Sequence, residues 1–310
     1  MAASTTGPEP HRRRPRRWRD TIARRAGRFL GVQDLFAAVE TMDEHVRGLS
    51  DRLVAQEARF EAQAAVWLTM HEFQLDRPTA GPCVSVVVPT RNRAALLPRA
   101  VASVAAQTYR CWQLVIVDDA SDDDTPTYLA GLDDPRIVVV PGKGQGVGAA
   151  RNRGLEAATG VYVAYLDDDN VMHPDWLGSV AWAFGRHPDV RVVLGCRIID
   201  DRGRVTGVEP DGVPSLDLPT FDRDGLRRAN VGDIGVIAHW RDLPSAHFDE
   251  RLDAAEDWDL LVRITADRPP LILPAIACLY TTTAPDRLSA SDLLLTSAEK
   301  VRRKHGAGEP

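Results

Sequence analysis

The sequence predicts an α/β protein built on a mostly parallel sheet and preceded by a long N-terminal helix. Two observations lead to this prediction. From Cys83 onward, short runs rich in Val and Ile alternate with helical segments, which is typical of a parallel sheet covered on both faces. Before that point, residues 32–70 show a seven-residue apolar repeat without proline, which is typical of one long helix.

The first 31 residues form an arginine-rich arm. Residues 1–30 hold nine Arg against Glu9 and Asp20, whereas the whole 310-residue chain has a net charge of −6, so the rest is strongly acidic. An acidic body argues against a nucleic-acid-binding domain, whose contact surface would be basic. We expect the arm to be disordered at first and helical from about Asp20. It is either a solvated tail or a weak contact with anionic lipid at the inner membrane surface.

Residues 32–76 are expected to form the long helix. Ten of the twelve positions in its 3-4 repeat are apolar, which favours a coiled coil that makes the protein a homo-oligomer through residues 32–70. The alternative is an amphipathic helix that lies on the domain following it. The repeat consists of Val32, Val39, Val46, Leu53, Phe60 and Trp67, and of Leu35, Met42, Leu49, Gln56, Gln63 and Met70.

The four cysteines, Cys83, Cys111, Cys196 and Cys278, are far apart and form no Cys-x-x-Cys pair. This spacing predicts buried thiols in a reducing compartment, without a zinc site or a disulfide framework. No segment approaches the roughly 18 apolar residues of a membrane-spanning helix. The basic N-terminus is not followed by the apolar stretch of a signal peptide. We therefore expect a cytoplasmic protein.

Residues 77–82, with two prolines and a glycine, are expected to link the helix to the α/β domain. That domain should cover residues 83–285, and residues 286–310 should form a C-terminal tail. The expected strands are Val84–Val88, Gln113–Val117, Ile137–Val140, Val161–Leu166 and Val190–Leu194. The expected helices are Ala94–Gln107, Thr125–Gly131, Gly148–Thr159 and Pro174–Arg186.

Acidic clusters follow two of the expected strands. Asp167, Asp168 and Asp169 come directly after Val161–Leu166, at the end of a sheet where ligands bind in such folds. Adjacent carboxylates favour a cation, and hard oxygen ligands select Mg²⁺ or Mn²⁺, often together with the phosphates of a substrate. The alternative for the three acids is a solvated turn. Asp118 and Asp119 follow the second strand, where they either accept hydrogen bonds from a nucleoside or cap a helix together with Ser121.

Residues 142–152 form a glycine-rich loop that leads into a helix. Backbone amides in such a loop can approach a phosphate at the helix N-terminus. The loop lacks the Gly-Lys-Ser/Thr ending of a Walker motif and does not follow the first strand. Both facts argue against a P-loop kinase and against a Rossmann dehydrogenase.

Five segments, taken in order, resemble the motifs of family 2 glycosyltransferases with the GT-A fold. They are VSVVVPTRNR, LVIVDDASDDDT, GVGAARNRGL, GVYVAYLDDDN and AEDWDLLVRI, and they lie within residues 83–265, about three fifths of the chain. The resemblance implies a nucleotide-diphosphate sugar donor, a hydroxyl acceptor and Mn²⁺ or Mg²⁺. It also implies that residues 83–170 form a nucleotide half and residues 171–285 an acceptor half.

The resemblance assigns roles to individual residues. It places the end of the first strand and four further residues at the nucleotide sugar, two acids of the Asp-x-Asp motif at the metal, and one acid at the acceptor. The residues expected at the donor are Pro89, Thr90, Arg91, Asp119, Arg151, Asp167 and Asp168. The expected metal ligands are Asp169 and Asp167, with a third protein ligand left open. Asp257 is implied as the catalytic base, supported by Glu256.

The residues around Asp257 support its role independently. Glu256 and Asp257 open an apolar helix, so both acids lie near its positive N-terminal end. Glycosyl transfer with inversion needs one carboxylate to accept the proton of the acceptor hydroxyl. The alternative role for both acids is helix capping. Trp258 is expected in the core, and His239 and His247 are expected to be structural.

The sequence contains no Gln-x-x-Arg-Trp motif, which argues against a processive polysaccharide synthase. We therefore expect a metal-dependent, inverting transferase that moves one sugar per encounter. One alternative is an oligomeric scaffold with a degenerate transferase domain, which the intact acids argue against. The other is a sugar nucleotidyltransferase, which would be expected to have a glycine-rich loop at its first strand end, where residues 90–93 hold none.

Overall fold

The computed structural model describes residues 41–54, 68–69, 71–74, 76–200, 216–217, 219, 221–230, 232–281 and 292–306. The chain divides into two compact units, Met1–Ala65 and Val66–Pro310. Residues 41–54 of the first unit are helical, as predicted, whereas the arm at residues 1–31 and most of the predicted repeat lie outside the described residues. The pairing of this helix with a second one stays a prediction.

The first half of the sheet is parallel and carries the polar strand ends. Its order is β3 (Ile137–Pro141), β2 (Trp112–Asp118), β1 (Val84–Thr90) and β4 (Tyr162–Tyr165). Thr90 at the end of β1 pairs with Asp118 at the end of β2, so the two strands end side by side. All seven residues of β1 are buried, which explains its unbroken apolar sequence.

The second half of the sheet is mixed. It continues from β4 through β8 (Ile237–Trp240), β6 (Val192–Asp200), β9 (Leu271–Thr281) and β5 (Val171–Met172), and β7 (Leu216–Asp217) pairs with β6. Strand β8 is antiparallel to β4, whereas β6 and β9 are parallel to each other. The predicted α/β class is confirmed, and the parallel arrangement holds for β3, β2, β1 and β4.

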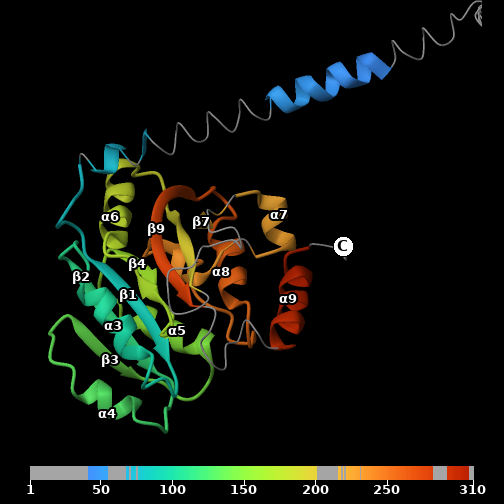
Figure 1. Ribbon diagram of the computed structural model, residues 1–310. Coiled ribbons are helices and arrows are strands. Elements are labelled where there is room, and N and C mark those ends of the chain that lie inside the picture. Colours follow the sequence, from blue (N-terminus) through green and yellow to red (C-terminus); the bar gives the residue numbers. More distant parts are fainter. Residues whose placement is uncertain are drawn as a thin grey trace, which may run out of the picture. The chain divides into compact units, whose positions relative to one another are not determined.

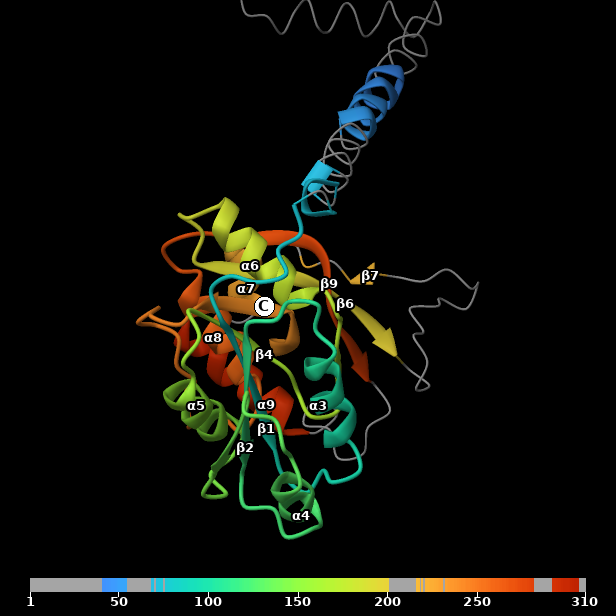
Figure 2. The same cartoon turned by 90° about the vertical axis from the view of Figure 1, so that its left-hand side faces the viewer.

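Helices cover both faces of the sheet (Figures 1 and 2). They are α3 (Leu97–Ala105), α4 (Thr125–Ala130), α5 (Val147–Ala157), α6 (Trp176–Arg186), α7 (Arg223–Arg228), α8 (Glu256–Ile264) and α9 (Asp292–Lys304), with a short 3₁₀ helix at Ile234–Val236. Figure 2 shows α3 and α5 on opposite sides of β1. A Cβ atom at Gly154 of α5 would lie 2.3 Å from Val87 of β1, so this glycine permits the close packing that positions α5.

The expected core residues are buried as predicted. Trp258 is 2% exposed, and its indole nitrogen donates to the carbonyl of Leu226 at 2.5 Å. His239 is fully buried between the hydroxyl of Tyr165 at 2.7 Å and the carbonyl of Trp240 at 2.8 Å. Both side chains therefore have structural partners.

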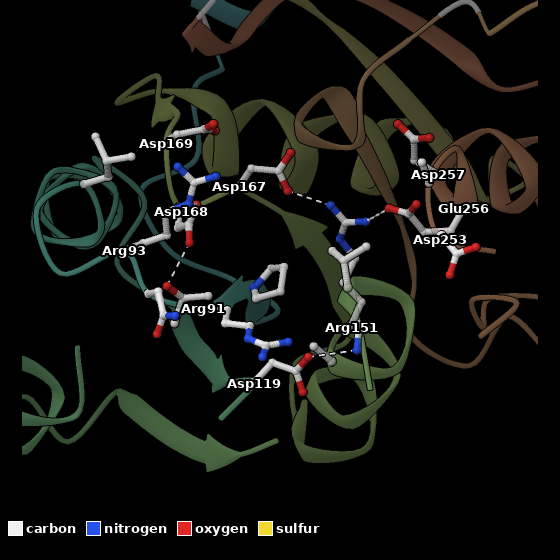
Figure 3. Close-up of a pocket in the computed structure, with 18 of the residues that line it drawn as sticks. Arg91, Arg93, Asp119, Arg151, Asp167, Asp168, Asp169, Asp253, Glu256 and Asp257 are labelled. Atoms are coloured by element: carbon white, nitrogen blue, oxygen red, sulfur yellow. Dashed lines mark hydrogen bonds and ion pairs between the residues drawn. The ribbon is translucent and has the colours of Figure 1, made fainter. Parts of the chain in front are cut away.

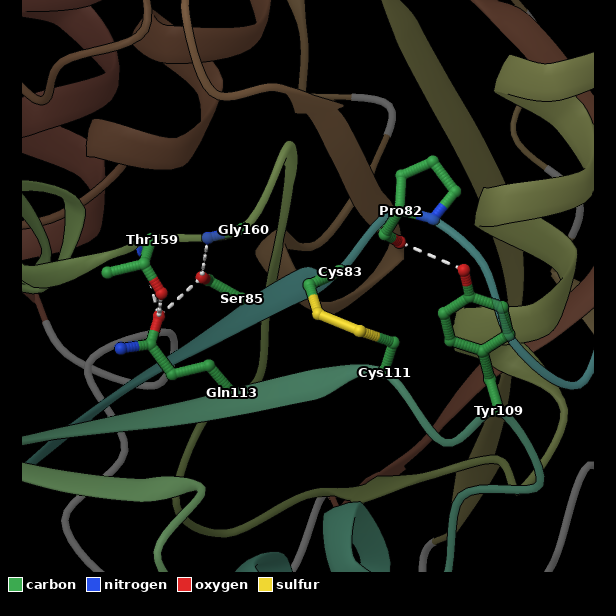
Figure 4. The surroundings of a disulfide bond; sticks show 8 residues. All are labelled: Pro82, Cys83, Ser85, Tyr109, Cys111, Gln113, Thr159 and Gly160. Carbon is green, nitrogen blue, oxygen red and sulfur yellow. Dashed lines mark hydrogen bonds between the residues drawn. A yellow bond between two sulfur atoms is a disulfide. The ribbon is translucent and has the colours of Figure 1, made fainter.

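Cys83 and Cys111 form a disulfide directly before β1 and β2 (Figure 4). The prediction of four reduced thiols is wrong for this pair, whereas Cys196 and Cys278 are buried thiols as expected. Val84 pairs with Trp112 in the sheet, so the residues that precede them meet. A disulfide is typical of an oxidising compartment, and the cysteines therefore no longer support the expected cytoplasmic location.

Helix α9 lies where a C-terminal tail was expected, and it packs against the α/β unit. Ser297 and Val301 are buried, and Lys304 forms an ion pair with Asp249 at 2.8 Å. Figure 1 shows α9 beside α8. None of the helices in the described ranges is long and apolar enough to span a bilayer.

Candidate active site

A cleft of about 1050 Å³ opens at the carboxyl ends of the parallel strands. Single small-molecule sites measure roughly 300–1,000 Å³, so this cleft has room for more than one small ligand. All of the predicted site residues line it, and Figure 3 shows its acidic and basic side chains facing one another. These residues are Pro89, Thr90, Arg91, Asp119, Arg151, Asp167, Asp168, Asp169, Glu256 and Asp257.

The ends of β1 and β4 are joined through Thr90. Its hydroxyl donates to Asp168 at 2.8 Å, and both side chains are buried. Burial raises the pKa of Asp168 to about 7, helped by the charges of Asp169 and Asp167 and opposed by Thr90 and Arg93. The middle acid of the cluster is therefore held by Thr90, and all three acids line the cleft.

Asp119 is surrounded by the glycine-rich loop. Its carboxylate accepts backbone hydrogen bonds from Gly144 at 2.7 Å, Gln145 at 3.2 Å and Gly146 at 2.8 Å. A Cβ atom at Gly142 would lie 2.6 Å from Asp119, so glycine is needed for this close approach. The amides expected to approach a phosphate therefore hold Asp119 in this structure. Asp118 instead accepts a hydrogen bond from the amide of Ser121 at 3.0 Å. Helix α4 begins only at Thr125 and has no side-chain cap, so the helix-capping alternative is wrong.

Arg151 of α5 connects the two halves of the cleft. Its guanidinium donates to Asp167 at 2.6 Å and also contacts Glu256 of α8 (Figure 3). The side chain is 3% exposed, and its Nε has no hydrogen-bond partner among the described residues. A buried cation between two carboxylates compensates their charge, so each of the three groups depends on the others.

Asp257 lies in the first turn of α8, partly exposed to the cleft. Its Oδ1 accepts a hydrogen bond from the backbone of Trp258 at 2.7 Å. Burial raises the pKa of Asp257, and the nearby charges of Glu256 and Asp233 raise it further, whereas Arg151 opposes the shift. An aspartate with a raised pKa is a stronger base than an ordinary one once it is ionised.

The acidic cluster fits a divalent cation. Asp167 and Asp169 line the cleft with carboxylate oxygens, the hard donors that Mg²⁺ and Mn²⁺ prefer. Among the described residues, no three His, Cys, Asp or Glu side chains are already arranged as a metal site. Mg²⁺ commonly uses one or two carboxylates and takes its other ligands from substrate phosphates and water, so a two-carboxylate set suits an ion that arrives with a diphosphate.

The structure adds cleft residues that the sequence analysis missed. Arg197 and Tyr280 come from strands β6 and β9, Asp233 directly precedes the 3₁₀ helix, and Leu293 comes from α9. Asp233 also caps the 3₁₀ helix through the amide of Gly235 at 2.9 Å. Their positions depend on strand pairings between distant segments, and none of these residues belongs to a motif.

Comparison with solved structures confirms the fold. Residues 1–349 of TarS from S. aureus, in complex with UDP-GlcNAc, match with a TM-score of 0.58 at 20% sequence identity. The match covers 72% of this chain and 65% of that one. At this level of identity the likeness shows the GT-A fold.

Sequence comparison identifies the family, whose model, Glycosyl transferase family 2, matches residues 85–234. Protein y4gI of Sinorhizobium fredii is 34% identical over 192 residues, which cover 59% of this chain and 20% of that protein. Succinoglycan biosynthesis protein ExoO of Rhizobium meliloti is 33% identical over 195 residues, with coverages of 60% and 56%. The PGL/p-HBAD biosynthesis glycosyltransferase of Mycobacterium bovis is 32% identical over 195 residues, with coverages of 59% and 70%. This chain thus spans between a fifth and about two thirds of its relatives' lengths, and it belongs to glycosyltransferase family 2.

Proposed function

We propose that this protein transfers one sugar from a nucleotide-diphosphate sugar to an acceptor hydroxyl, with a divalent metal ion and with inversion. The observation that supports this function most is the convergence of two groups in one cleft. The Asp167–Asp169 cluster at the end of β4 and the acid Asp257 of α8 line the same cavity. A donor diphosphate at the first group would direct its sugar toward the second.

Asp257 is the proposed base. It accepts the proton of the acceptor hydroxyl while the acceptor oxygen bonds to C1 and the bond from C1 to the diphosphate breaks. The raised pKa of Asp257 makes its carboxylate a stronger base. The positive charge of Arg151 lowers this pKa and so opposes the rise. Arg151 also fixes Glu256, the residue before Asp257, by their buried contact.

Asp169 is the proposed main metal ligand, with Asp167 as the second. The ion pair between Arg151 and Asp167 involves the Oδ1 atom of Asp167, so we assign the metal to its other oxygen, Oδ2. When bound there, Mn²⁺ or Mg²⁺ supplies positive charge to the departing diphosphate. Asp119, at the end of β2, is proposed to read the base, and the loop amides that donate to its carboxylate hold it in position.

A thermal-shift series tests this donor site. UDP, GDP, dTDP and CDP are each added with and without Mn²⁺. We expect one nucleotide to raise the melting temperature, more strongly with the metal, because ligands that bind only the folded state stabilise it. Asp169→Ala should lose the metal-dependent part, whereas Asp253→Ala, which removes an acid at the cleft rim, should keep it. No shift with any nucleotide would overturn the proposal.

We also propose that residues 32–70 pair with a second copy of the chain. In the described helix at residues 41–54, Met42, Val46, Leu49 and Leu53 follow the 3-4 spacing, and each is more than half exposed. Light scattering should give an oligomer for the wild type and a monomer for the double variant Val46→Asp, Leu49→Asp. Asp43→Asn, outside the repeat, is the control. An unchanged mass in the double variant would contradict this pairing.

A further inference from the structure

Asp233 is a buried acid in the wall of the cleft. The residue lines the cleft and is only 8% exposed. One of its carboxylate oxygens, Oδ1, accepts a hydrogen bond from the amide of Gly235 at 2.9 Å. No hydrogen bond or ion pair from any other residue that the structure describes reaches the second oxygen, Oδ2. A buried polar atom without a partner costs free energy, so this oxygen indicates a donor group that a ligand supplies.

The backbone around Asp233 is held firmly in place. Asp233 directly precedes the short 3₁₀ helix, in which Ile234 and Val236 are each 1% exposed. A Cβ atom at Gly235 would lie 3.0 Å from the sulfur of Cys278, so this turn packs directly against β9. The carboxylate is thus positioned before a ligand arrives, and a hydrogen bond to it requires little further ordering.

Asp233 is close both to the proposed metal ligands and to the proposed base. Burial raises the pKa of Asp233 to about 7, the charge of Asp167 raises it further, and the charges of two arginines oppose the rise. The charge of Asp233 in turn adds to the rise that burial and Glu256 cause in the pKa of Asp257. Such effects come from nearby charges, so Asp233 is a neighbour of Asp167 and of Asp257 alike.

The transferred sugar must occupy the space between these two groups. Its C1 carries the diphosphate on one side and is attacked on the other side by the acceptor oxygen that Asp257 deprotonates. An acid that is close to both Asp167 and Asp257 therefore borders the sugar ring. Hydroxyl groups surround that ring, and each of them can donate a hydrogen bond to a carboxylate.

We propose that Asp233 binds the transferred sugar of the donor, by accepting a hydrogen bond from one of its hydroxyl groups at Oδ2. The inference rests on the proposed function, because it takes the donor to be a nucleotide-diphosphate sugar. Asp233 thus adds affinity for the sugar nucleotide and none for the free nucleoside diphosphate. It also selects donors that carry a hydroxyl group at the position that Oδ2 faces.

Isothermal titration calorimetry of the full chain with Mn²⁺ tests this by comparing two affinities. The probes are UDP-glucose, UDP-N-acetylglucosamine, GDP-mannose and dTDP-glucose, each paired with its free nucleoside diphosphate. Asp233→Ser keeps an oxygen that can accept from the amide of Gly235, but its side chain is too short to reach the sugar. For the sugar nucleotide that the wild type binds most tightly, Asp233→Ser should weaken binding about tenfold, because the lost hydrogen bond has a charged acceptor. The affinity for the matching free diphosphate should not change.

Asp233→Asn separates the hydrogen bond from the charge. It removes the same charge as Asp233→Ser but keeps an amide group that forms a hydrogen bond with a hydroxyl. Charge-assisted hydrogen bonds are roughly twice as strong as neutral ones, so Asp233→Asn should lose only about threefold in affinity for the sugar nucleotide. Asp253→Ser, which removes an exposed acid at the cleft rim, is the matched control and should lose nothing.

Three results would overturn the inference. They are an unchanged sugar-nucleotide affinity in Asp233→Ser, equal losses for the sugar nucleotide and the free diphosphate, and equal losses in the Ser and Asn variants. In each of these cases the free diphosphate still binds the wild type, so the donor site of the proposed function is retained. A wild type that binds neither member of any pair would instead overturn the donor site, and the inference with it.

Discussion

Two regions of the molecule, one around Asp119 and one around α8, are held by different kinds of contact. Asp119 follows β2 directly, and three backbone amides of the adjoining loop hold its carboxylate. At α8, Glu256 depends on Arg151 of α5, and Asp259 depends on Lys304 at the end of α9. Neighbouring backbone thus holds Asp119, whereas charged side chains from distant elements hold Glu256 and Asp259.

This difference has a physical consequence. Backbone amides do not titrate and are present in every variant, so the position of Asp119 should tolerate changes of pH and of side chains. Buried ion pairs fail when one partner is removed, because the remaining charge stays buried without compensation. Glu256 and Asp259 should therefore be more sensitive to such changes than Asp119.

Arg151→Met would break the contact between the halves and should have the largest effect. It leaves Glu256 buried without its partner, which typically costs about 3–5 kcal/mol in the free energy of unfolding. The double variant Arg151→Met, Glu256→Gln should recover part of that loss, because the uncompensated charge is gone. Urea unfolding measures the free energy of unfolding of the single and of the double variant. Equal stability of the single variant and the wild type would show that the contact does not hold the halves together.

Removal of the disulfide tests how much the bond stabilises the end of the sheet that lies opposite the cleft. Cys83 and Cys111 are separated by 28 residues, so the loss of loop closure should lower the free energy of unfolding by about 3 kcal/mol in the Cys83→Ser, Cys111→Ser variant. Nucleotide affinity should not change, because the cleft lies at the other ends of the strands. Reductant should destabilise the wild type and leave the variant unaffected; a wild type insensitive to reductant would contradict the bond.

Asp259→Asn should weaken the attachment of α9 and remove a contribution to stability that depends on pH. Burial alone raises the pKa of Asp259, but hydrogen bonds from Lys304 and His305 and the charge of Arg263 outweigh it, so its pKa is lowered. The pairing therefore stabilises the fold above the ordinary aspartate value of about 3.9 and is lost as the pH falls toward the lowered pKa.

Unfolding in urea at neutral and at acidic pH measures this effect. At pH 7 we expect a loss of about 2 kcal/mol in the variant, since the bonds involve charged groups. The difference between variant and wild type should shrink on acidification. A difference that stays constant with pH would mean that the ionised carboxylate contributes nothing.

Asp233→Asn should give the smallest effect, a shift in the pH dependence of transfer. The charge of Asp233 raises the pKa of Asp257, so its removal lowers that pKa and moves the rising limb of kcat/KM to lower pH. Asn keeps an oxygen for the amide of Gly235, so the fold is preserved. Asp253→Asn at the cleft rim should leave the limb in place. A rising limb that stays in place in Asp233→Asn would show that the charge of Asp233 does not act on the pKa of Asp257.

The sequence predicted the half that is built locally. The strands from Val84 to Tyr165 and the acids that follow them were expected because each acidic cluster directly follows an apolar run. The environment of Asp257 was not predictable in the same way, since Arg151 and Asp233, whose charges act on its pKa, come from segments distant in the sequence. The disulfide was missed because 28 residues separate two cysteines that the sheet register brings together.

The most direct test of the central claim compares Asp169→Ala with Asp257→Asn in two assays, nucleotide binding and release of nucleotide from its sugar donor. If the donor and the base lie in separate halves of one cleft, Asp169→Ala should weaken both activities, most clearly in the presence of Mn²⁺. Asp257→Asn should bind nucleotide like the wild type and lose release by about a hundredfold or more. Release that persists in Asp257→Asn, or nucleotide binding lost with it, would contradict the assignment of Asp257 as the base.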